Sequence, residues 1–206
     1  MTSLTVVQGI DVSNWQGALD WPAWRGKIGF AMAKATEGDA ITDAEFGRNW
    51  GGMWAFQADH RLPRFAYAFF HPALDPVVQA AHLVATVKGH GLLPGDNFVL
   101  DVEVNDGLPP AVVAARAREC LQHVNELAPG HRVLVYTFPA FAQAGNCEGL
   151  ESWYLWLADY GVAAPTAPAP WSRTTLWQYS DQPIDGDRFM GDEAHLLAFT
   201  RMPDKR

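Results

Sequence analysis

Strand-like and helix-like segments alternate along this chain from residue 6 to about residue 158, and this alternation limits the possible folds more than any other feature. The apolar segments that we predict to be strands are residues 6–12, 30–36, 64–70, 97–104, 132–137, 153–158 and 175–180. The predicted helices cover residues 22–27, the segment after the capping-box-like Thr42-Asp43-Ala44-Glu45, the segment from Asp75-Pro76, and residues 110–127. Strands joined by helical crossovers pair in parallel, so the pattern predicts a parallel sheet.

Seven or eight strands in 206 residues predict a small (β/α) barrel that spans residues 1–206 as one domain. The second half of the chain has too few helical segments for eight complete strand–helix units. The fold class that we expect is therefore α/β, an incomplete TIM-like barrel with reduced helix content in the C-terminal half. An open doubly wound sheet is the alternative.

The predicted strand at residues 97–104 contains two acids, Asp101 and Glu103, on the same parity. Side chains two apart on a strand point to one face, with backbones ~6.6 Å apart at about 3.3 Å per residue. Two carboxylates on one face of an interior strand repel each other and lose hydration, so this pair needs an explanation. The turn-like Asn105-Asp106-Gly107 places it at the C-terminal end of a strand, where α/β barrels carry their chemistry. A solvated pair beyond the strand end is the competing interpretation.

Composition excludes several other functions. The formal net charge of -8, without a Lys/Arg cluster, argues against a nucleic-acid partner. The seven histidines lack metal-ligand spacing and the two cysteines are too few for a disulfide framework, so we expect no metal and no cofactor. No apolar run reaches the roughly 20 residues of a membrane span. The nine tryptophans are unusual, and flat aromatic faces are suited to stacking on sugar rings.

Further acids and aromatic residues lie at or just beyond the other predicted strand ends. The acids are Asp11, Glu37, Asp185 and Asp187, and for Glu37 and Asp187 a solvated strand end or helix cap is the stronger interpretation. The aromatic residues are Tyr67, Phe69, Tyr136, Trp156, Tyr160, Trp177 and Tyr179. Acids that converge on an aromatic rim, without a phosphate loop or a nucleophilic Ser/His pattern, favour glycoside hydrolysis. In that chemistry one protonated carboxyl serves the leaving oxygen, and nearby negative charge stabilises the transition state.

Eight short motifs in order give the chain a resemblance to a known family. They are Gly9-Ile10-Asp11-Val12-Ser13, Trp15-Gln16-Gly17, Lys34-Ala35-Thr36-Glu37-Gly38, Leu100-Asp101-Val102-Glu103, Tyr136-Thr137, Leu155-Trp156-Leu157-Ala158, Trp177-Gln178-Tyr179-Ser180 and Ile184-Asp185. Together they resemble glycoside hydrolase family 25, the Chalaropsis-type lysozymes that occur as catalytic domains of phage endolysins. One motif departs from the family, since Ala68 follows Tyr67 where the family often has His.

The resemblance implies a flattened, incomplete barrel that cleaves the β-1,4 bond between N-acetylmuramic acid and N-acetylglucosamine in peptidoglycan. By position, Glu103 resembles the family's general acid and Asp101 its partner acid, while Asp11 and Asp185 match the other two acids of the cleft. We expect Tyr67, Phe69, Tyr136, Trp156, Trp177 and Glu37 to bind substrate, with a core role as the alternative for Trp156.

The mechanism and the substrate leave alternatives open. A D-x-E pair fits both the ~5–5.5 Å carboxyl separation of retaining enzymes and the ~6.5–9.5 Å separation of inverting ones. We favour a substrate-assisted retaining route in which Asp101 orients the acetamido group. A chitinase-like enzyme is the nearest competitor, although its D-x-x-D-x-D-x-E motif is broken here because Val99 follows Asp96 where the second Asp should stand. An inactive glycan-binding module is the other alternative.

The expected partner is bacterial peptidoglycan, with no nucleic acid, no membrane and a monomeric state. Residues Met1 to Thr5 carry no basic region followed by an apolar one, so we expect no signal peptide. The corresponding expectation is synthesis in the cytoplasm of a phage-infected cell and action on the wall after release, or secretion if a signal peptide has been removed.

Overall fold

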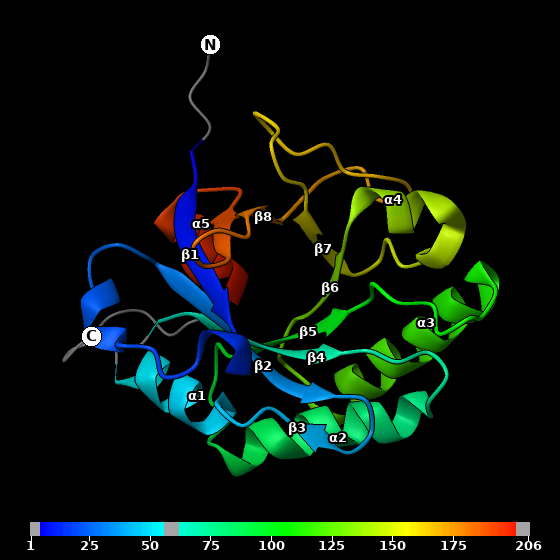
Figure 1. Cartoon of the computed structure of the whole chain (residues 1–206), viewed down its shortest axis with the longest axis horizontal. Coiled ribbons are helices and arrows are strands. Elements are labelled where there is room, and N and C mark those ends of the chain that lie inside the picture. The colour runs from blue at the N-terminus through cyan, green and yellow to red at the C-terminus, as the bar shows by residue number, and fades with distance from the viewer. Residues whose placement is uncertain (1–4, 56–61, 201–206) are drawn as a thin grey trace.

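The computed structural model describes residues 5–55 and 62–200, and its strands form one sheet that closes on itself (Figure 1). The strands are β1 Val7–Val12, β2 Phe30–Glu37, β3 Ile41–Thr42, β4 Arg64–Phe69, β5 Asn97–Asp101, β6 Val133–Thr137, β7 Tyr154–Ala158, β8 Leu176–Ser180 and β9 Gly186–Phe189. Their order is β1-β9-β8-β7-β6-β5-β4-β2-β3, and β1 also pairs with β2. Eight of these nine strands therefore close a barrel, and β3 pairs with β2 outside the ring.

The barrel is mixed rather than fully parallel. Neighbouring strands are parallel from β1 through β2, β4, β5, β6 and β7 to β8. The last strand, β9, is antiparallel to both β8 and β1, and it closes the ring without a helical crossover. The expected fold class, an incomplete TIM-like barrel, is confirmed.

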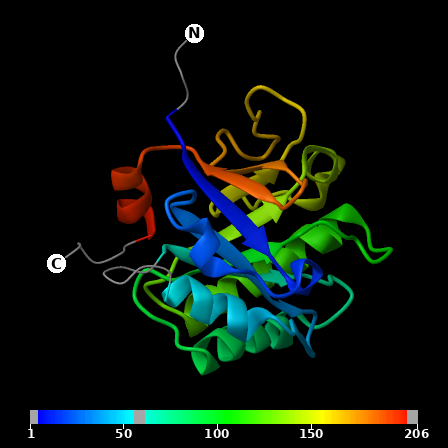
Figure 2. The ribbon, with the colours of Figure 1, turned by 60° about the vertical axis from the view of Figure 1, so that its left-hand side comes forward.

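The helices are concentrated on one part of the barrel. They are α1 Phe46–Trp54, α2 Pro76–Gly89, α3 Pro110–Leu127, α4 Pro139–Phe141 and α5 Glu193–Thr200. The first three pack against β2, β4, β5 and β6, and Figures 1 and 2 show them together on one side with α5 apart from them. Only the three-residue α4 and a π-helical turn at Ala142–Asn146 stand between β6 and β7, which confirms the reduced helix content of the second half. None of the described helices is both long and apolar enough to cross a membrane.

Strand parity separates two apolar cores. Alternate residues of β5, Phe98 and Leu100, face the helices, whereas Val99 faces the barrel interior. The interior core consists of Phe30, Met32, Phe65, Tyr67, Val99, Leu134, Trp156, Leu176, Phe189 and Leu196. Because Leu196 of α5 joins Phe30 and Phe65 near the strand N-termini, α5 fills the interior at that end. The interior is left open to chemistry at the other end, where the strands finish.

The helix starts that we predicted from capping residues are only partly confirmed by the structure. Asp75 caps α2 as expected, and its Oδ1 accepts hydrogen bonds from the N–H groups of Val77 and Val78 at 2.8 and 3.2 Å. The capping box expected at Thr42–Glu45 is wrong, because Thr42 belongs to β3 and α1 starts at Phe46 without a side-chain cap. The expected helix at residues 22–27 is a short 3₁₀ turn at Trp21–Trp24, and Trp21 packs against Gly52, where a Cβ would lie 2.0 Å from its ring.

Several strand and helix ends also differ from expectation. The ladder of β5 ends at Asp101 rather than at residue 104, where Asp101 pairs with Phe69, the last residue of β4, and with Tyr136 of β6. One further backbone hydrogen bond joins the chain to β6, because Val102 N–H donates to the Tyr136 carbonyl at 2.9 Å. The short strand β3, the antiparallel β9 and helix α5 were not expected from the sequence.

The two cysteines, Cys120 and Cys147, are buried thiols that do not form a disulfide.

Candidate functional site

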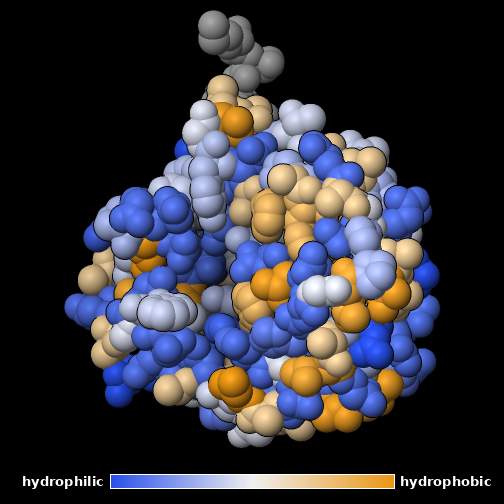
Figure 3. All heavy atoms as spheres, turned by 45° about the vertical axis from the view of Figure 1, so that its right-hand side comes forward, coloured by the Kyte–Doolittle hydropathy of each residue, from blue (hydrophilic) through white to orange (hydrophobic). Residues whose placement is uncertain are grey.

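The C-terminal ends of the parallel strands surround a cavity of about 210 Å³. Its lining residues are Asp11, Ser13, Trp15, Lys34, Tyr67, Phe69, Asp101, Glu103, Tyr136, Trp156, Tyr160, Gln178 and Asp185. Five of them are the next inward-facing residues along their strands after members of the apolar interior core, so the barrel becomes more polar at this level: Lys34, Phe69, Asp101, Tyr136 and Gln178. Figure 3 shows a hollow bordered by hydrophilic residues on the left of the view.

The acids predicted from the D-x-E segment both line this cavity, but at different depths. Asp101 is the last residue of β5 and is 6% exposed, whereas Glu103 lies two residues beyond the strand and is partly exposed. Burial raises the pKa of Asp101 well above its usual range, and the neighbouring Glu103 raises it further. Burial also raises the pKa of Glu103, while the positive charge of Lys34 opposes that rise. The two carboxyls therefore favour protonation more than solvated acids do.

Asp11 is the third acid of the cavity, and it lies near the C-terminal end of β1 with its side chain toward the barrel interior. Its Oδ2 accepts a hydrogen bond from Gln178 Nε2 at 2.7 Å, and Gln178 Oε1 accepts from the hydroxyls of Tyr136 and Tyr160. Burial raises the pKa of Asp11 to about 7, with a smaller contribution from the charge of Asp185. Gln178 thus fixes the orientation of Asp11 and both tyrosines at once.

Asp185 comes from the connection between β8 and β9, and a tight turn after β1 holds it. Its Oδ2 accepts from Gln16 Nε2 at 3.1 Å, and Gln16 Oε1 in turn accepts from Ser13 N–H at 2.8 Å. The Ser13 hydroxyl accepts from Trp15 N–H, which completes a capping box on the 3₁₀ turn at Asn14–Gln16. Burial raises the pKa of Asp185 to about 6, and Asp181 adds to the rise.

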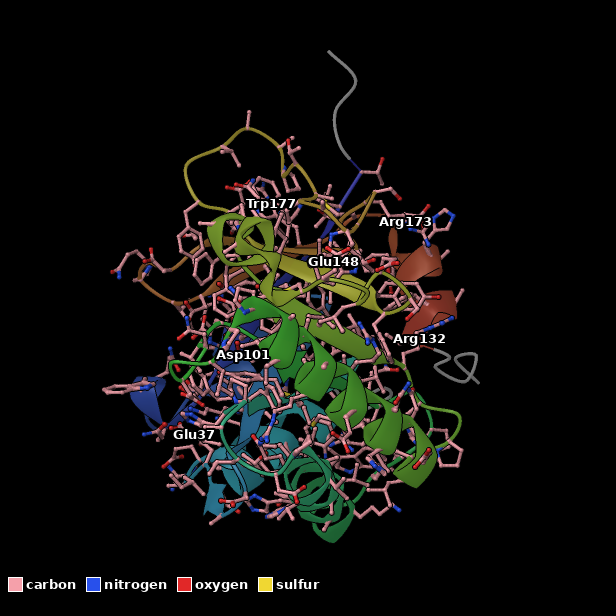
Figure 4. The ribbon with its side chains drawn as sticks, turned by 90° about the vertical axis from the view of Figure 1, so that its right-hand side faces the viewer. Glu37, Asp101, Arg132, Glu148, Arg173 and Trp177 are labelled. Atoms are coloured by element: carbon pink, nitrogen blue, oxygen red, sulfur yellow. The ribbon has the colours of Figure 1, made fainter. Side chains whose placement is uncertain are left out.

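Glu37 does not line the cavity but supports a residue that does. Its carboxylate accepts from Lys34 Nζ at 2.6 Å and lies 3.5 Å from His71 Nε2. The hydrogen bond from Lys34 lowers the pKa of Glu37, so Glu37 is ionised near neutral pH. Lys34 Nζ also lies 5.0 Å from the centre of the Phe69 ring, which holds the only lysine of the cavity lining against an aromatic wall. Figure 4 shows Glu37 and Asp101 toward the same edge of the sheet, opposite Arg132 at the start of β6.

The aromatic residues divide by strand parity. Tyr67, Phe69, Tyr136 and Trp156 line the cavity as expected, and Trp156 also belongs to the interior core, with its ring 4.5 Å from that of Tyr136. The expected place of Trp177 in the cleft is wrong: it is 1% exposed, is absent from the cavity lining and donates from Nε1 to the Asp159 carbonyl at 2.8 Å. Leu176 and Gln178 face inward, so the residue between them must face outward.

Four residues of functional interest were missed or misjudged from the sequence. The positions of Lys34 and Gln178 were predictable, since each lies two residues after an inward-facing residue of the same strand. Trp15 lines the mouth of the cavity with 85% of its surface exposed, and only the turn geometry reveals that position. Asp187 was expected at a solvated strand end, and this is wrong. It is fully buried, and its Oδ1 accepts from Trp156 Nε1 at 2.8 Å.

The arrangement places four carboxyls with raised pKa values against an aromatic wall. A neutral carboxyl can donate a proton, and an ionised one can stabilise positive charge that develops on a bound ring. Among residues 5–55 and 62–200, no group of three or more His, Cys, Asp and Glu side chains is arranged to hold a metal ion.

Comparisons with known proteins identify relatives over nearly the whole chain. The sequence model of the family described as glycosyl hydrolases family 25 matches residues 10–187. Lysozyme M1 of Streptomyces globisporus is 32% identical over 93% of this chain and 70% of its own length. The N,O-diacetylmuramidase of Chalaropsis sp is 28% identical over 85% of this chain and 88% of its own length. A crystal structure of the bacterial lysozyme from Streptomyces coelicolor is 29% identical with a TM-score of 0.84, covering 97% of this chain and 98% of that one.

Proposed function

The chain belongs to glycosyl hydrolase family 25 and is a lysozyme-type glycoside hydrolase acting on peptidoglycan, and from this we propose a specific bond and specific residue roles. The proposed bond is the β-1,4 link between N-acetylmuramic acid and N-acetylglucosamine. The observation that carries the proposal is the convergence of Asp11, Asp101, Glu103 and Asp185 on one aromatic-lined cavity. Glycosidases use such a set of acids to protonate the leaving oxygen and to stabilise an oxocarbenium-like transition state.

Glu103 is the proposed general acid. It is partly exposed on the cavity wall, so its carboxyl can reach the oxygen between two sugar rings without being sealed from substrate. Burial raises its pKa, which keeps a larger fraction of the carboxyl protonated near neutral pH. After proton transfer the same group, now ionised, can accept a proton from the water that completes hydrolysis.

Asp101 is proposed to orient the acetamido group of the substrate. It is buried beside Glu103, and its Oδ1 has no hydrogen-bond partner among the described residues. An acetamido N–H bound there would satisfy that oxygen and would turn the acetamido oxygen toward the anomeric carbon. That oxygen forms a bond to the anomeric carbon as the bond to the leaving oxygen breaks, and the leaving oxygen takes the proton of Glu103. Water then opens the cyclic intermediate, so the product retains its β configuration.

Asp11 and Asp185 are proposed to supply negative charge on the other side of the sugar. Both are oriented by glutamine amides, at 2.7 and 3.1 Å, so their charge is in place before the reaction starts. Tyr67 and Tyr136 on the wall and Trp15 at the mouth offer aromatic faces for the apolar sides of the glycan rings.

Reducing-end analysis of digested peptidoglycan tests the proposed bond directly. The expected result is new N-acetylmuramic acid reducing ends and none from N-acetylglucosamine. New N-acetylglucosamine ends would refute the proposal. Hydrolysis of chitin oligomers without hydrolysis of peptidoglycan would support a chitinase-like enzyme, and binding without turnover would support an inactive glycan-binding module.

A further inference from the structure

Asp187 is a buried acid on β9 that the proposed chemistry leaves without a role. It is 0% exposed and is paired in the sheet with Gly9 of β1 on one side and Gln178 of β8 on the other. It is not part of the cavity lining, so substrate cannot reach it. Its position is one layer below the acids of the cavity, between the strands that carry Asp11 and Gln178.

The hydrogen bonds around Asp187 leave one oxygen to explain. Oδ1 accepts from Trp156 Nε1 at 2.8 Å, whereas no described donor reaches the buried Oδ2. Asp187 pairs with Gly9, two residues before Asp11 on the same face of β1, and with Gln178, whose amide binds Asp11. The carboxyls of Asp187 and Asp11 are therefore neighbours on the inner face of the barrel, and each affects the pKa of the other. Asp11 uses Oδ2 to accept from Gln178, which leaves its Oδ1 to face Asp187. Two carboxyls can form a hydrogen bond only if one of them carries a proton.

We infer that Asp187 is a positioning residue that holds a proton in the resting enzyme and donates it in a hydrogen bond to the Asp11 carboxylate. The pair then carries one negative charge rather than two. That charge resides on Asp11, the member that lines the cavity, and Gln178 and Asp187 fix its direction from two sides. The inference rests on the proposed function in one respect, because it explains how Asp11 stays anionic and oriented beneath the substrate.

The charged surroundings of Asp187 agree with this assignment. Burial raises the pKa of Asp187 well above its usual range, and the nearby charges of Asp11 and Asp185 raise it further. Trp156 on β7 and Gln178 on β8 face it as neutral groups. The adjacent Arg188 has the opposite strand parity, and its guanidinium lies 4.1 Å from the centre of the Tyr179 ring on the outer side. The groups that affect the pKa of Asp187 most strongly include no cation.

Infrared difference spectroscopy on the substrate-free enzyme at pH 8, above the pKa of about 7 of Asp11, tests the proton directly. Other buried acids such as Asp101 also contribute protonated-carboxyl bands, so the test is the one component that Asp187→Asn removes and Asp11→Asn retains, because Asp187 holds the proton. The matched control is Asp96→Asn, an equally buried acid paired with Arg64 at 2.8 Å, which should leave that component unchanged. Retention of every protonated-carboxyl component in Asp187→Asn would place the proton elsewhere and overturn the inference.

Two activity measurements separate positioning from mere packing. Asp187→Ala should lower kcat about ten- to hundredfold, because Asp11 loses a donor in a buried site. Asp187→Asn should restore most of that loss, since its amide can donate to Asp11 while its carbonyl accepts from Trp156. Equal losses in both variants, or no loss in Asp187→Ala, would overturn the inference.

Carboxyl-carbon NMR of wild type labelled at aspartate gives a readout that needs no variant to fold. The Cγ resonance of Asp187 should keep the shift of a protonated carboxyl at pH 8, and an ionised Asp187 at that pH would overturn the inference. Neither spectroscopic test involves substrate. A different cleaved bond would therefore refute the proposed function while leaving the result for Asp187 intact.

Discussion

The acids of the cavity share one chemical group but differ in what surrounds each carboxyl. Asp101 is buried with an unpartnered oxygen, Glu103 is partly exposed, and Asp11 accepts from Gln178. Environments that differ in this way assign different protonation states to identical side chains. Substitutions that keep the shape of the side chain and remove the acid therefore test each role separately.

Glu103→Gln should lower the rate of peptidoglycan hydrolysis by about 10²–10⁴-fold, because the amide is nearly isosteric but has no proton to donate. Initial rates on purified walls, together with an unchanged melting temperature, measure the effect. Glu148→Gln is the matched control, since Glu148 is exposed and lies outside the cavity lining. A Glu103→Gln enzyme within a few-fold of wild type would show that another residue supplies the proton.

Asp101→Asn should also lower the rate sharply, because an amide orients the substrate N–H less well than a carboxylate. Wild type should release the β anomer first, as the substrate-assisted route requires. NMR of the first-formed anomer measures this outcome. An α product would instead indicate inversion, with a carboxylate activating water for direct attack.

Strand parity explains most of what the sequence could predict about the site. Val99 faces the interior, so Asp101 two residues later had to face the cavity, and the same reasoning holds for Tyr67, Phe69, Tyr136 and Trp156. Strand parity applied to β8 would also have excluded Trp177 from the cavity lining and would have placed Gln178 in it. Strand parity could not predict the positions of Trp15 and Asp187. Their positions depend on a turn and on an antiparallel strand that only three-dimensional pairing defines.

One buried ion pair locks the start of β4 to the segment before β5. Arg64 donates from Nε and Nη2 to the two carboxylate oxygens of Asp96, each at 2.8 Å. The guanidinium also donates to the carbonyls of Trp50 and Gly91, and it lies 3.9 Å from the centre of a Trp50 ring. Asp96, the residue that suggested a chitinase motif, is therefore part of the scaffold, at the end of the strands opposite the cavity.

Arg64→Met should lower the free energy of unfolding by about 3–5 kcal/mol, because Asp96 would remain buried without its partner. Denaturant unfolding measures the loss, and the rate per folded molecule should stay close to wild type. Arg48→Met is the matched control: Arg48 pairs with Glu45 at 3.2 Å on the surface, and its loss should cost below about 1 kcal/mol. A similar small effect for Arg64→Met would mean that Asp96 finds water or another donor.

The barrel as a whole was predictable in its first half and less so in its second. The helical crossovers between β2, β4, β5 and β6 predict parallel pairing of these strands, because alternating strands and helices form parallel sheets. After β6 the crossovers shorten to turns and loops, and the four-residue β9 carries the polar Asp187 and Arg188 among its residues. Ring closure by an antiparallel strand has no local signal of that kind, which is why the closing strand and α5 were not expected.

The cluster of buried acids should make the folded protein less stable near pH 8 than near pH 5. The pKa of Asp11 is raised to about 7 and that of Asp185 to about 6, so the folded state binds more protons than the unfolded state between about pH 4 and 7. Stability is therefore fully present below the unfolded pKa values and falls as pH rises through the folded ones. At about 1.4 kcal/mol per pKa unit, Asp11 alone could cost up to about 4 kcal/mol at pH 8.

Urea unfolding across this pH range measures the slope, and two substitutions isolate its cause. The net charge of -8 adds a general repulsion that also grows with pH, so the comparison must remove one carboxylate in each variant. Asp11→Asn removes a buried carboxyl and should flatten the slope, leaving the variant more stable than wild type at pH 8. Asp39→Asn removes an exposed one from the turn after β2, and it should keep the slope of the wild type. Equal slopes in both variants would attribute the pH dependence to overall charge rather than to the cavity, because only Asp11→Asn changes the burial of a charged group.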